Sequence, residues 1–257
     1  TGAAYMAATG AMRAGAGLVT LGLPEGLNPV MEAKTTEVMT APLPQTFEGG
    51  LCAVSYPVLK TLMEGKSAIV FGPGLGRADG VSALLDKVLK ETTVPVVIDA
   101  DGLNCLAGRV YILKKAKCQI VLTPHPGEMA RLLGTSVSDI QKDRIASAEL
   151  LSKKTGAVVV LKGAATVIAS PGGQVYINPT GSSALATAGT GDVLCGMIGG
   201  LISQGLDILS ASVAAVYGHG LASERWTDAN KGEAGMMATD LLGFIPVVLN
   251  SFVSRRP

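Results

Sequence analysis

The stretch SAIVFGPGLGRADGVSALLDKVLKETTVPVVIDADGLN, residues 67–104, contains the pattern that decides the fold class. Residues 67–76 have the composition of a buried strand that ends in a glycine loop, and residues 94–104 that of a second strand running into a polar loop. Between them, residues 80–91 repeat apolar side chains at helical spacing. A strand, an amphipathic helix and a strand in succession are typical of a parallel βαβ unit. This stretch therefore predicts an α/β fold.

The rest of the chain continues the alternation of strands and helices. We predict further strands at 17–24 and 157–163, and within residues 118–128 a strand that runs into a polar loop. Residues 166–170 and 174–178 are expected to form a hairpin around Pro171-Gly172-Gly173. The sequence thus predicts a mainly parallel central sheet with helices on both faces and a small antiparallel hairpin.

Two helical regions are also predicted. Ser138 and Gln141 have the spacing of a capping box, which predicts one helix over residues 139–154. From Gly189 onward the pattern is mostly helical, with a glycine-rich break near 230–235. No internal repeat or linker interrupts the chain, so we predict one domain over residues 1–257.

Composition limits the classes of function. The 257 residues are 48% hydrophobic, with a formal net charge of +1, which gives no electrostatic attraction for nucleic acid or an anionic membrane. The longest apolar stretches, 193–202 and 241–249, are far shorter than the roughly 20 residues of a membrane helix. Small-molecule partners are therefore favoured over nucleic acid and membranes.

The four cysteines indicate a reducing compartment. None of them forms a C-x-x-C pair, and all lie among apolar or small residues: Cys52, Cys105, Cys118 and Cys195. Disulfide and zinc interpretations are weak for such a pattern. We therefore expect a cytoplasmic protein.

Glycine-rich and polar segments follow each predicted strand. In an open α/β sheet the ligand lies outside the carboxyl ends of the strands, so these segments are expected to converge on one cleft. They are residues 72–76, 99–104, 123–128, 162–163 and 189–192.

Several side chains in these segments have two interpretations each. Asp99 and Asp101, two apart on a predicted extended strand, should point to one face, where they bind a metal or ligand hydroxyls or cap the next helix. The Lys162 amine either serves a ligand or snorkels to the surface. His125 is a functional residue or a structural loop residue, and His219 is favoured as a packing residue.

Residues 186–196, ATAGTGDVLCG, carry the strongest functional signal. The amides of Gly189, Thr190 and Gly191 can approach a ligand unobstructed, and the predicted helix that follows points its positive end at the same place. This arrangement predicts an anion hole. Asp192 beside it is either a helix N-cap or a base, and a base next to a bound phosphate is typical of phosphoryl transfer.

The combination of motifs resembles a known family. In order and spacing, the segments GPGLGR (72–77), DADGLN (99–104), LTPHPGEMARLLG (122–134), VVLKGAATVIASPGG (159–173) and ATAGTGDVLCG (186–196) are similar to those of the ADP/ATP-dependent NAD(P)H-hydrate dehydratases. The resemblance covers nearly the whole chain and implies a ribokinase-like fold. Members of this family have a first strand and a glycine loop upstream of the segment that begins here at Thr1. The resemblance therefore implies that the chain lacks its N-terminal strand.

The resemblance also implies a repair reaction. NADH or NADPH hydrated at C6 of the nicotinamide ring is phosphorylated on the new hydroxyl, and phosphate is then eliminated. Asp192 would be the base, and the amides of Gly189, Thr190 and Gly191 would hold the transferred phosphate. Matching positions assign the nucleotide to Lys162, Gly163, Ala164, Ala165, Thr166 and Gly191, and the hydrate to Ala3, Gly76, His125 and Asp192.

Further implications concern the co-substrates. Glu128 occupies the place of the glutamate in the N-x-x-E motif of ribokinase-like kinases and is a candidate for ordering Mg²⁺ through water. TPHPGE, residues 123–128, is similar to the bacterial form of the family that uses ADP rather than ATP. Two segments depart from the family pattern: Ala188 replaces a glycine, and Ser182-Ser183-Ala184 replaces Asn-Pro-Gly. Expected partners are the hydrates of NADH and NADPH, a fused or separate epimerase, and further copies of the chain in a homotetramer.

Two alternative functions stay open at this point. A kinase of a small alcohol, such as a thiazole or hydroxymethylpyrimidine, would share the fold but leave a stable phosphate ester. A nucleotide-binding module without turnover would need no base, and the presence of Asp192 argues against it.

Overall fold

The computed structural model describes residues 1–76 and 79–252. Six strands form the main sheet in the order β3-β4-β5-β6-β7-β8, and β1 and β2 form a separate parallel pair. The strands are β1 (Thr20–Pro24), β2 (Met39–Leu43), β3 (Ile69–Phe71), β4 (Val96–Ile98), β5 (Ile120–Leu122), β6 (Val158–Leu161), β7 (Val167–Ala169) and β8 (Val175–Ile177). Strands β3 to β6 run parallel, whereas β7 and β8 are antiparallel, which confirms the predicted sheet and hairpin.

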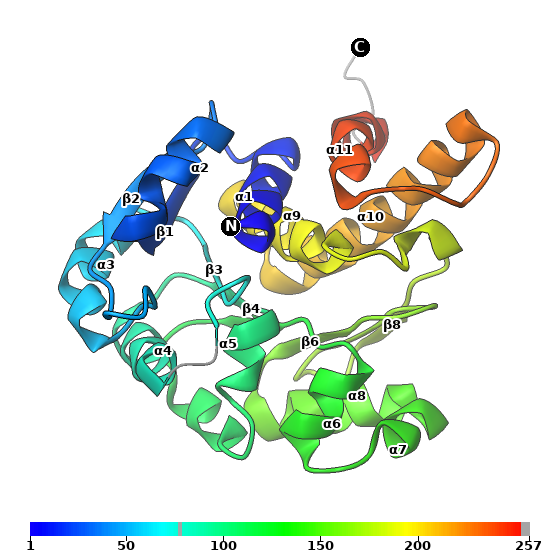
Figure 1. Ribbon diagram of the computed structural model, residues 1–257. Helices are drawn as coiled ribbons and strands as arrows, with labels where there is room; N and C mark the ends of the chain where they lie inside the picture. Colours follow the sequence, from blue (N-terminus) through cyan, green and yellow to red (C-terminus); the bar gives the residue numbers. More distant parts are fainter. Residues whose placement is uncertain (77–78, 253–257) are drawn as a thin grey trace.

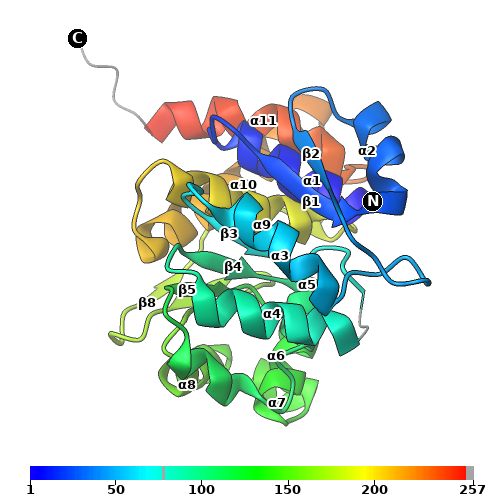
Figure 2. The same cartoon turned by 90° about the vertical axis from the view of Figure 1, so that its left-hand side faces the viewer.

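Helices cover both faces of the main sheet (Figures 1 and 2). The α-helices are α1 (Gly2–Arg13), α2 (Asn28–Lys34), α3 (Tyr56–Met63), α4 (Asp79–Glu91), α5 (Ala100–Asn104), α6 (Pro126–Leu133), α7 (Val137–Lys142), α8 (Arg144–Thr155), α9 (Thr190–Ser203), α10 (Ile208–Asn230) and α11 (Ala238–Phe252). Short 3₁₀ helices span Glu25–Leu27, Ala53–Ser55, Val110–Lys115 and Ser183–Leu185. None of the helices in the described ranges has the length and apolar content needed to cross a bilayer.

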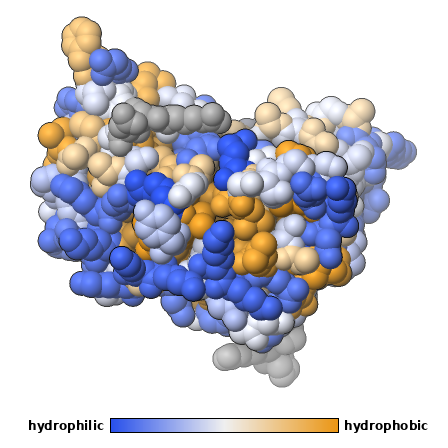
Figure 3. Space-filling view, turned by 90° about the horizontal axis from the view of Figure 1, so that it is seen from below, coloured by the Kyte–Doolittle hydropathy of each residue, from blue (hydrophilic) through white to orange (hydrophobic). Residues whose placement is uncertain are grey.

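The main sheet separates two hydrophobic cores because its side chains alternate between its faces. On β4, Val96 and Ile98 belong to the core that includes α4, α6 and α8, whereas Val97 belongs to the core of α1, α9, α10 and α11. The central strands β4, β5 and β6 are buried on both faces, as parallel strands between helical layers must be. Viewed from the side of α6 to α8, the surface is mostly hydrophilic, with smaller hydrophobic areas between (Figure 3).

Glycine allows α1 and α9 to pack closely. A Cβ atom built on Gly196 of α9 would overlap the carbonyl oxygen of Ala7 on α1, and one built on Gly200 would lie 2.6 Å from the carbonyl oxygen of Ala11. Real Cβ atoms do not approach so closely, so only glycine fits at these two positions. The contact fixes α9 against α1 and thereby places the amino end of α9.

The predicted helix over residues 139–154 is wrong. The chain forms two helices there, α7 and α8, separated by Asp143 in an extended conformation (φ −149°, ψ 90°). The predicted capping pair of Ser138 and Gln141 is not used. Instead, the Ser136 hydroxyl accepts the Asp139 amide at 3.1 Å, and the Asp143 carboxylate accepts the Ala146 amide at 2.8 Å. Each helix therefore has its own polar cap, and these caps determine the boundaries.

Candidate active site

The loops after the parallel strands meet at one edge of the main sheet. Because β3, β4, β5 and β6 are parallel, their carboxyl ends lie at the same edge. Phe71, Ile98, Leu122 and Leu161 end these strands, so the predicted segments 72–76, 99–104, 123–128 and 162–163 follow directly. The predicted convergence of these four segments is confirmed, and the amino end of α9 lies beside Lys162.

A buried ion pair occupies the centre of this edge. The Lys162 ammonium donates to the Asp99 carboxylate at 2.7 Å and lies 3.9 Å from the Glu128 carboxylate. The Lys162 and Asp99 side chains are only 19% and 2% exposed. Burial disfavours the charged amine, but these carboxylates raise the pKa of Lys162 above its usual value. The snorkelling interpretation of Lys162 is therefore wrong: the amine is held inside the site.

The interpretation of Asp99 and Asp101 as neighbours on an extended strand is also wrong. Strand β4 ends at Ile98, and Ala100 begins α5 with φ +48°, so the two carboxylates belong to a helix start rather than to one strand face. Asp99 turns to Lys162, whereas Asp101 accepts the Gly76 amide at 2.8 Å. Because β4 ends at Ile98, the Asp99 and Asp101 carboxylates do not share one face and they contact different groups.

The segment predicted to form an anion hole lies at the amino end of α9. Gly189 precedes the helix with φ +94°, and Thr190 and Gly191 form its first two residues. The Thr190 carbonyl accepts a hydrogen bond from His219 Nε2 at 2.9 Å. Burial lowers the pKa of His219 to about 4, so this imidazole is a neutral donor, and its interpretation as a satisfied packing residue is confirmed.

Asp192 lies in the first turn of α9 but is not its N-cap. Gly189 holds the N-cap position, so the capping interpretation of Asp192 is wrong. The Asp192 carboxyl is half-buried, and its pKa is raised to about 6 by burial and by the nearby Asp99 carboxylate, with Lys162 opposing this shift. Such a carboxylate is a stronger proton acceptor than an exposed aspartate and still ionised near neutral pH.

The backbone conformation of Ala188 explains why alanine can replace the glycine of the family pattern at this position. Positive φ values at residues other than glycine occur in the described ranges only at Ala100, Ala165 and Lys231. Ala188 therefore does not need the conformation that favours glycine. The left-handed residue is Gly189, which the sequence retains. A Cβ at Gly189 would also lie 3.1 Å from Ala238.

His125 and Glu128 form a capping box at the start of α6. The His125 Nδ1 atom accepts the Gly127 amide at 2.9 Å, and the Glu128 carboxylate accepts the His125 amide at 2.8 Å. Burial and the cations Lys162 and Arg131 lower the pKa of His125, which agrees with an unprotonated Nδ1. Burial raises the pKa of Glu128, with Lys162 opposing the shift.

The donor set here suits a weakly held hard cation. No group of three or more His, Cys, Asp or Glu side chains able to hold a metal occurs in the described ranges. Mg²⁺ is commonly held by one or two carboxylates together with substrate phosphates and waters, and does not require such a cage. The buried carboxylate of Glu128, with one oxygen already accepting an amide, fits a role in ordering those waters.

The segment Lys162–Thr166 is shaped by a residue from α8. The Arg144 guanidinium donates to the carbonyls of Leu161 at 3.0 Å and Lys162 at 3.3 Å, and it also contacts the Ala164 carbonyl. Gly163 has φ +140° and Ala165 φ +50°, so the backbone turns sharply, and residues 163–165 are exposed. Thr166 closes the turn by donating to the Gly163 carbonyl at 2.9 Å.

The remaining predicted site residues lie around the same edge. A Cβ built on Gly74 would contact Ala3 at 3.4 Å, which places the start of α1 against the loop that contains Gly76. Sequence reasoning missed the role of Arg144, because it lies 18 residues from Lys162 on a separate helix and no motif contains it. It also missed that His219 supports Thr190, which a lone histidine in a helix does not reveal.

Comparison with known proteins identifies the family. The family model described as NAD(P)H-hydrate dehydratase matches residues 1–247. A bifunctional NAD(P)H-hydrate repair enzyme from Moorella thermoacetica is 48% identical over 98% of this chain, which spans 47% of that relative. The ADP-dependent (S)-NAD(P)H-hydrate dehydratase of Bacillus subtilis is 38% identical over 98% of this chain and 85% of its own length.

Solved structures support the same assignment. The crystal structure of an ADP/ATP-dependent NAD(P)H-hydrate dehydratase from Bacillus subtilis, co-crystallized with ATP/Mg²⁺, superposes with a TM-score of 0.83 and 35% identity, over 98% of this chain and 85% of that one. A ribokinase-like superfamily protein from Enterococcus faecalis superposes with a TM-score of 0.80 and 26% identity, over 98% and 83%. The chain spans about half the length of the bifunctional relatives. From its fold and its sequence, this chain belongs to the NAD(P)H-hydrate dehydratase family, within the ribokinase-like fold.

Proposed function

We propose that the chain dehydrates the hydrates of NADH and NADPH at the expense of ADP. The observation that carries this proposal is Asp192, a half-buried carboxylate with a pKa raised to about 6, in the first turn of α9. It lies beside an amino-terminal loop suited to a phosphate and close to the Lys162 ammonium. A base, a phosphate site and a buried cation at one edge are what phosphoryl transfer to a hydroxyl requires.

In the first step, Asp192 accepts the proton of the C6 hydroxyl of the hydrate. The hydroxyl oxygen forms a bond to the terminal phosphorus of ADP, and the bond from that phosphorus to the bridging oxygen breaks, releasing AMP. The amides of Gly189, Thr190 and Gly191 stabilise the charge on the transferred phosphoryl group at the positive end of α9.

In the second step, the phosphate group leaves the ring. The C6–O bond breaks, a proton is lost from C5, and a C5–C6 double bond forms, so the products are NAD(P)H and inorganic phosphate. Phosphate is a better leaving group than hydroxide, which is why the reaction consumes a nucleotide. Ala3, Gly76 and His125 are proposed to surround the ring, since they lie at the same edge as Asp192.

The nucleotide is proposed to lie on the segment Lys162–Thr166 and on Gly191. The sharp turn at Gly163 and Ala165 is exposed, and Lys162 provides a fixed positive charge. Glu128 would order the waters of a Mg²⁺ ion, which when bound supplies further charge neutralisation at the phosphates.

Turnover of the hydrate tests the proposed function. We expect this chain, incubated with acid-generated NADH hydrate, ADP and Mg²⁺, to restore the absorbance of NADH and to release inorganic phosphate and AMP. A stable phosphate ester without restored NADH would instead indicate a kinase. The same assay compares donors: ADP is expected to give a higher kcat/KM than ATP, and the reverse order would overturn only the choice of nucleotide.

The pH dependence of this turnover follows from Asp192. Because the base acts when deprotonated, kcat/KM is expected to fall tenfold per pH unit below a pKa of about 6 and to be constant above it. His219, with a pKa of about 4, stays neutral over this range and contributes no second acidic step. Steady-state rates between pH 5 and 9 give the profile. An acidic limb with a midpoint near 4 would contradict the assignment of a desolvated base.

We also infer the surroundings in which the enzyme acts. The described cysteines Cys52, Cys105, Cys118 and Cys195 are free thiols, which supports a reducing cytoplasm. An epimerase that interconverts the hydrate epimers is proposed as a partner, fused or separate. A homotetramer is proposed on the family resemblance, and light scattering coupled to gel filtration measures its mass.

A further inference from the structure

We propose that Arg131 binds the diphosphate bridge of the dinucleotide hydrate and thereby holds the nicotinamide ring beside Asp192. This role rests on the proposed function, because it concerns the substrate proposed for the same edge of the sheet. A guanidinium group binds phosphate oxygens through two N–H groups at once. Arg131 would therefore favour substrates that carry the bridge over substrates that carry only the ring and its ribose.

A chain of hydrogen bonds fixes the Arg131 guanidinium. Its Nε atom donates to the side-chain oxygen of Asn104 at 3.1 Å, and the side-chain amide nitrogen of Asn104 donates to the Asp101 carboxylate at 3.3 Å. The Asp101 carboxylate also accepts the Gly76 amide at 2.8 Å. These bonds join α6, α5 and the loop after β3, so the position of the guanidinium is coupled to that of Gly76.

The guanidinium lies next to a residue proposed to surround the ring. Helical side chains point back toward the amino end of their helix, and Arg131 is four residues after Gly127 in α6. A Cβ atom built on Gly127 would lie 2.8 Å from His125 Cε1 and 3.8 Å from Arg131 Nη1. Burial and the cations Lys162 and Arg131 lower the pKa of His125. The charge of Arg131 therefore acts at the place proposed for the ring.

The terminal nitrogens of Arg131 are available to a ligand. The residue is exposed, and its Nη groups make no hydrogen bond with residues 1–76 and 79–252. By contrast, the Lys162 ammonium is paired with Asp99, and the Arg144 guanidinium donates to three backbone carbonyls. Arg131 uses only Nε to hold its own position and keeps its other donors for a ligand.

The charges at this edge show why a bound diphosphate needs a further cation. The carboxylates of Asp101 and Asp192 would repel its negative charges. Gly76 carries no charge, and His125 accepts an amide through Nδ1, as a neutral imidazole does. These residues provide no compensating charge. Arg131 provides it, and its guanidinium is already held in place before the substrate binds.

The diphosphate bridge is the nearer of two phosphate groups that Arg131 could bind. The bridge is separated from the nicotinamide ring by one ribose. The other group is the 2′-phosphate of NADPH hydrate, which lies beyond the bridge on the second ribose. Because Arg131 is adjacent to His125, where the ring is proposed to lie, we assign the bridge to it.

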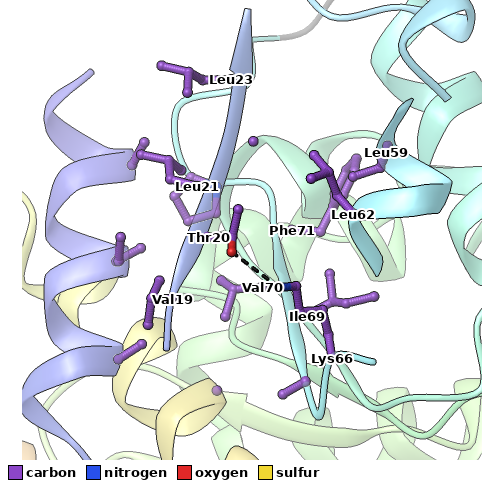
Figure 4. A pocket seen from close by; sticks show the side chains of 18 of the residues that line it. Val19, Thr20, Leu21, Leu23, Leu59, Leu62, Lys66, Ile69, Val70 and Phe71 are labelled. Atoms are coloured by element: carbon purple, nitrogen blue, oxygen red, sulfur yellow. Dashed lines mark hydrogen bonds between the residues drawn. The ribbon is translucent and has the colours of Figure 1, made fainter. Parts of the chain in front are cut away.

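A cavity of about 570 Å³ between β1 and β3 is less suited to these phosphates (Figure 4). Its walls are mostly apolar and include leucines of β1 and α3. Among the described residues that line it, Lys66 alone has a charged side chain, and its ammonium donates to the Thr20 hydroxyl at 3.2 Å. Lys66 precedes β3, so it lies at the opposite end of that strand from the loop that contains Gly76.

Kinetics with three substrates test the role of Arg131. The hydrates of NADH and NADPH both carry the bridge, whereas the hydrate of reduced nicotinamide riboside carries no phosphate. We expect Arg131→Met to raise KM for both dinucleotide hydrates about tenfold or more, because a hydrogen-bonded charge is lost. The kcat and the KM for ADP should change by less than about twofold, as expected for a contact that binds substrate and transition state equally. For the riboside hydrate, the KM of the variant should equal that of the unaltered chain.

Two further variants complete the kinetic test. Lys153→Met removes an exposed charge from the last turn of α8, which leads into the amino end of β6, away from the site. It should change none of these constants. Arg131→Lys keeps the charge but loses the Nε bond to Asn104, so its KM for the dinucleotide hydrates should lie between those of the unaltered chain and Arg131→Met. This variant also replaces Arg131→Met if the latter does not fold.

Three kinetic outcomes would overturn the role of Arg131. Equal increases in KM for the riboside and dinucleotide hydrates would show that Arg131 only supports the fold. An increase confined to NADPH hydrate would assign Arg131 to the 2′-phosphate. An increase in the KM for ADP alone would place it in the nucleotide site.

Equilibrium binding separates this role from the proposed function. In calorimetry without ADP, we expect the unaltered chain to bind NADH, the reaction product, about tenfold more tightly than Arg131→Met does. If the unaltered chain restores NADH from the hydrate but Arg131→Met keeps the same KM and Kd, only the role of Arg131 is wrong. If the unaltered chain neither restores NADH nor binds it, the proposed function is wrong, and the role of Arg131 with it.

Discussion

Replacing Asp192 by asparagine is expected to lower kcat by about 10²- to 10⁴-fold, the range typical for loss of a general base. Asparagine keeps the size and shape of the side chain but accepts no proton from the C6 hydroxyl. The nucleotide site at Lys162–Thr166 is untouched, so ADP affinity, measured by calorimetry, should be nearly unchanged. Turnover of the hydrate is measured on the same preparation.

Melting of this variant distinguishes a lost base from a damaged fold. The pKa of Asp192 is raised to about 6 in the folded chain, so stability falls as the pH rises from the ordinary aspartate pKa to about 6, and the full loss is present at pH 8. Asp192→Asn removes that charge and is expected to melt at pH 8 at the same temperature as the original chain or higher. Near-normal turnover would remove Asp192 from the mechanism, and lower stability with lost nucleotide binding would assign it a structural role.

Replacing Gly196 by alanine is expected to reduce the free energy of unfolding by about 3 kcal/mol or more. The new methyl group would overlap the Ala7 carbonyl oxygen, so α1 would have to move away from α9. This movement would open the core that Val97 and Val121 share with both helices. Urea denaturation measures the loss.

A matched substitution isolates the steric cause. Gly243 lies inside α11, exposed, and a Cβ atom built on it would have no neighbour within 4 Å. Gly243→Ala should therefore stabilise the chain by about 0.5–1 kcal/mol through helix propensity alone. If Gly196→Ala and Gly243→Ala had similar effects, the close approach of α1 and α9 would not limit stability.

Much of the fold could be predicted from the sequence because its signals are local. Apolar runs that end in glycine or polar loops indicated β3, β4, β5 and β6, and Pro171-Gly172-Gly173 indicated the hairpin of β7 and β8. The boundary between α7 and α8 was missed because it depends on which of several polar residues caps a helix. Ser136 and Asp143 cap the two helices, and Ser138 does not. Composition alone does not show which polar residue serves as a cap.

The candidate site was harder to predict because its decisive contacts join distant residues. The loops were found from their position after strands, but the pairing of Lys162 with Asp99 joins residues 63 apart. The support of Thr190 by His219 and of Lys162 by Arg144 likewise depends on how helices pack. Burial and the Asp99 carboxylate on another segment together raise the pKa of Asp192.

The contact between Gly196 and Ala7 has an evolutionary consequence. A larger residue in a core is often accommodated by a second substitution that makes its neighbour smaller. Here the obstacle is a backbone carbonyl oxygen, which every amino acid carries, so no replacement at position 7 can make room. A second substitution at position 7 therefore cannot relieve the clash. A lineage that loses this glycine must move the whole helix or lose the alignment of α9 that holds Asp192.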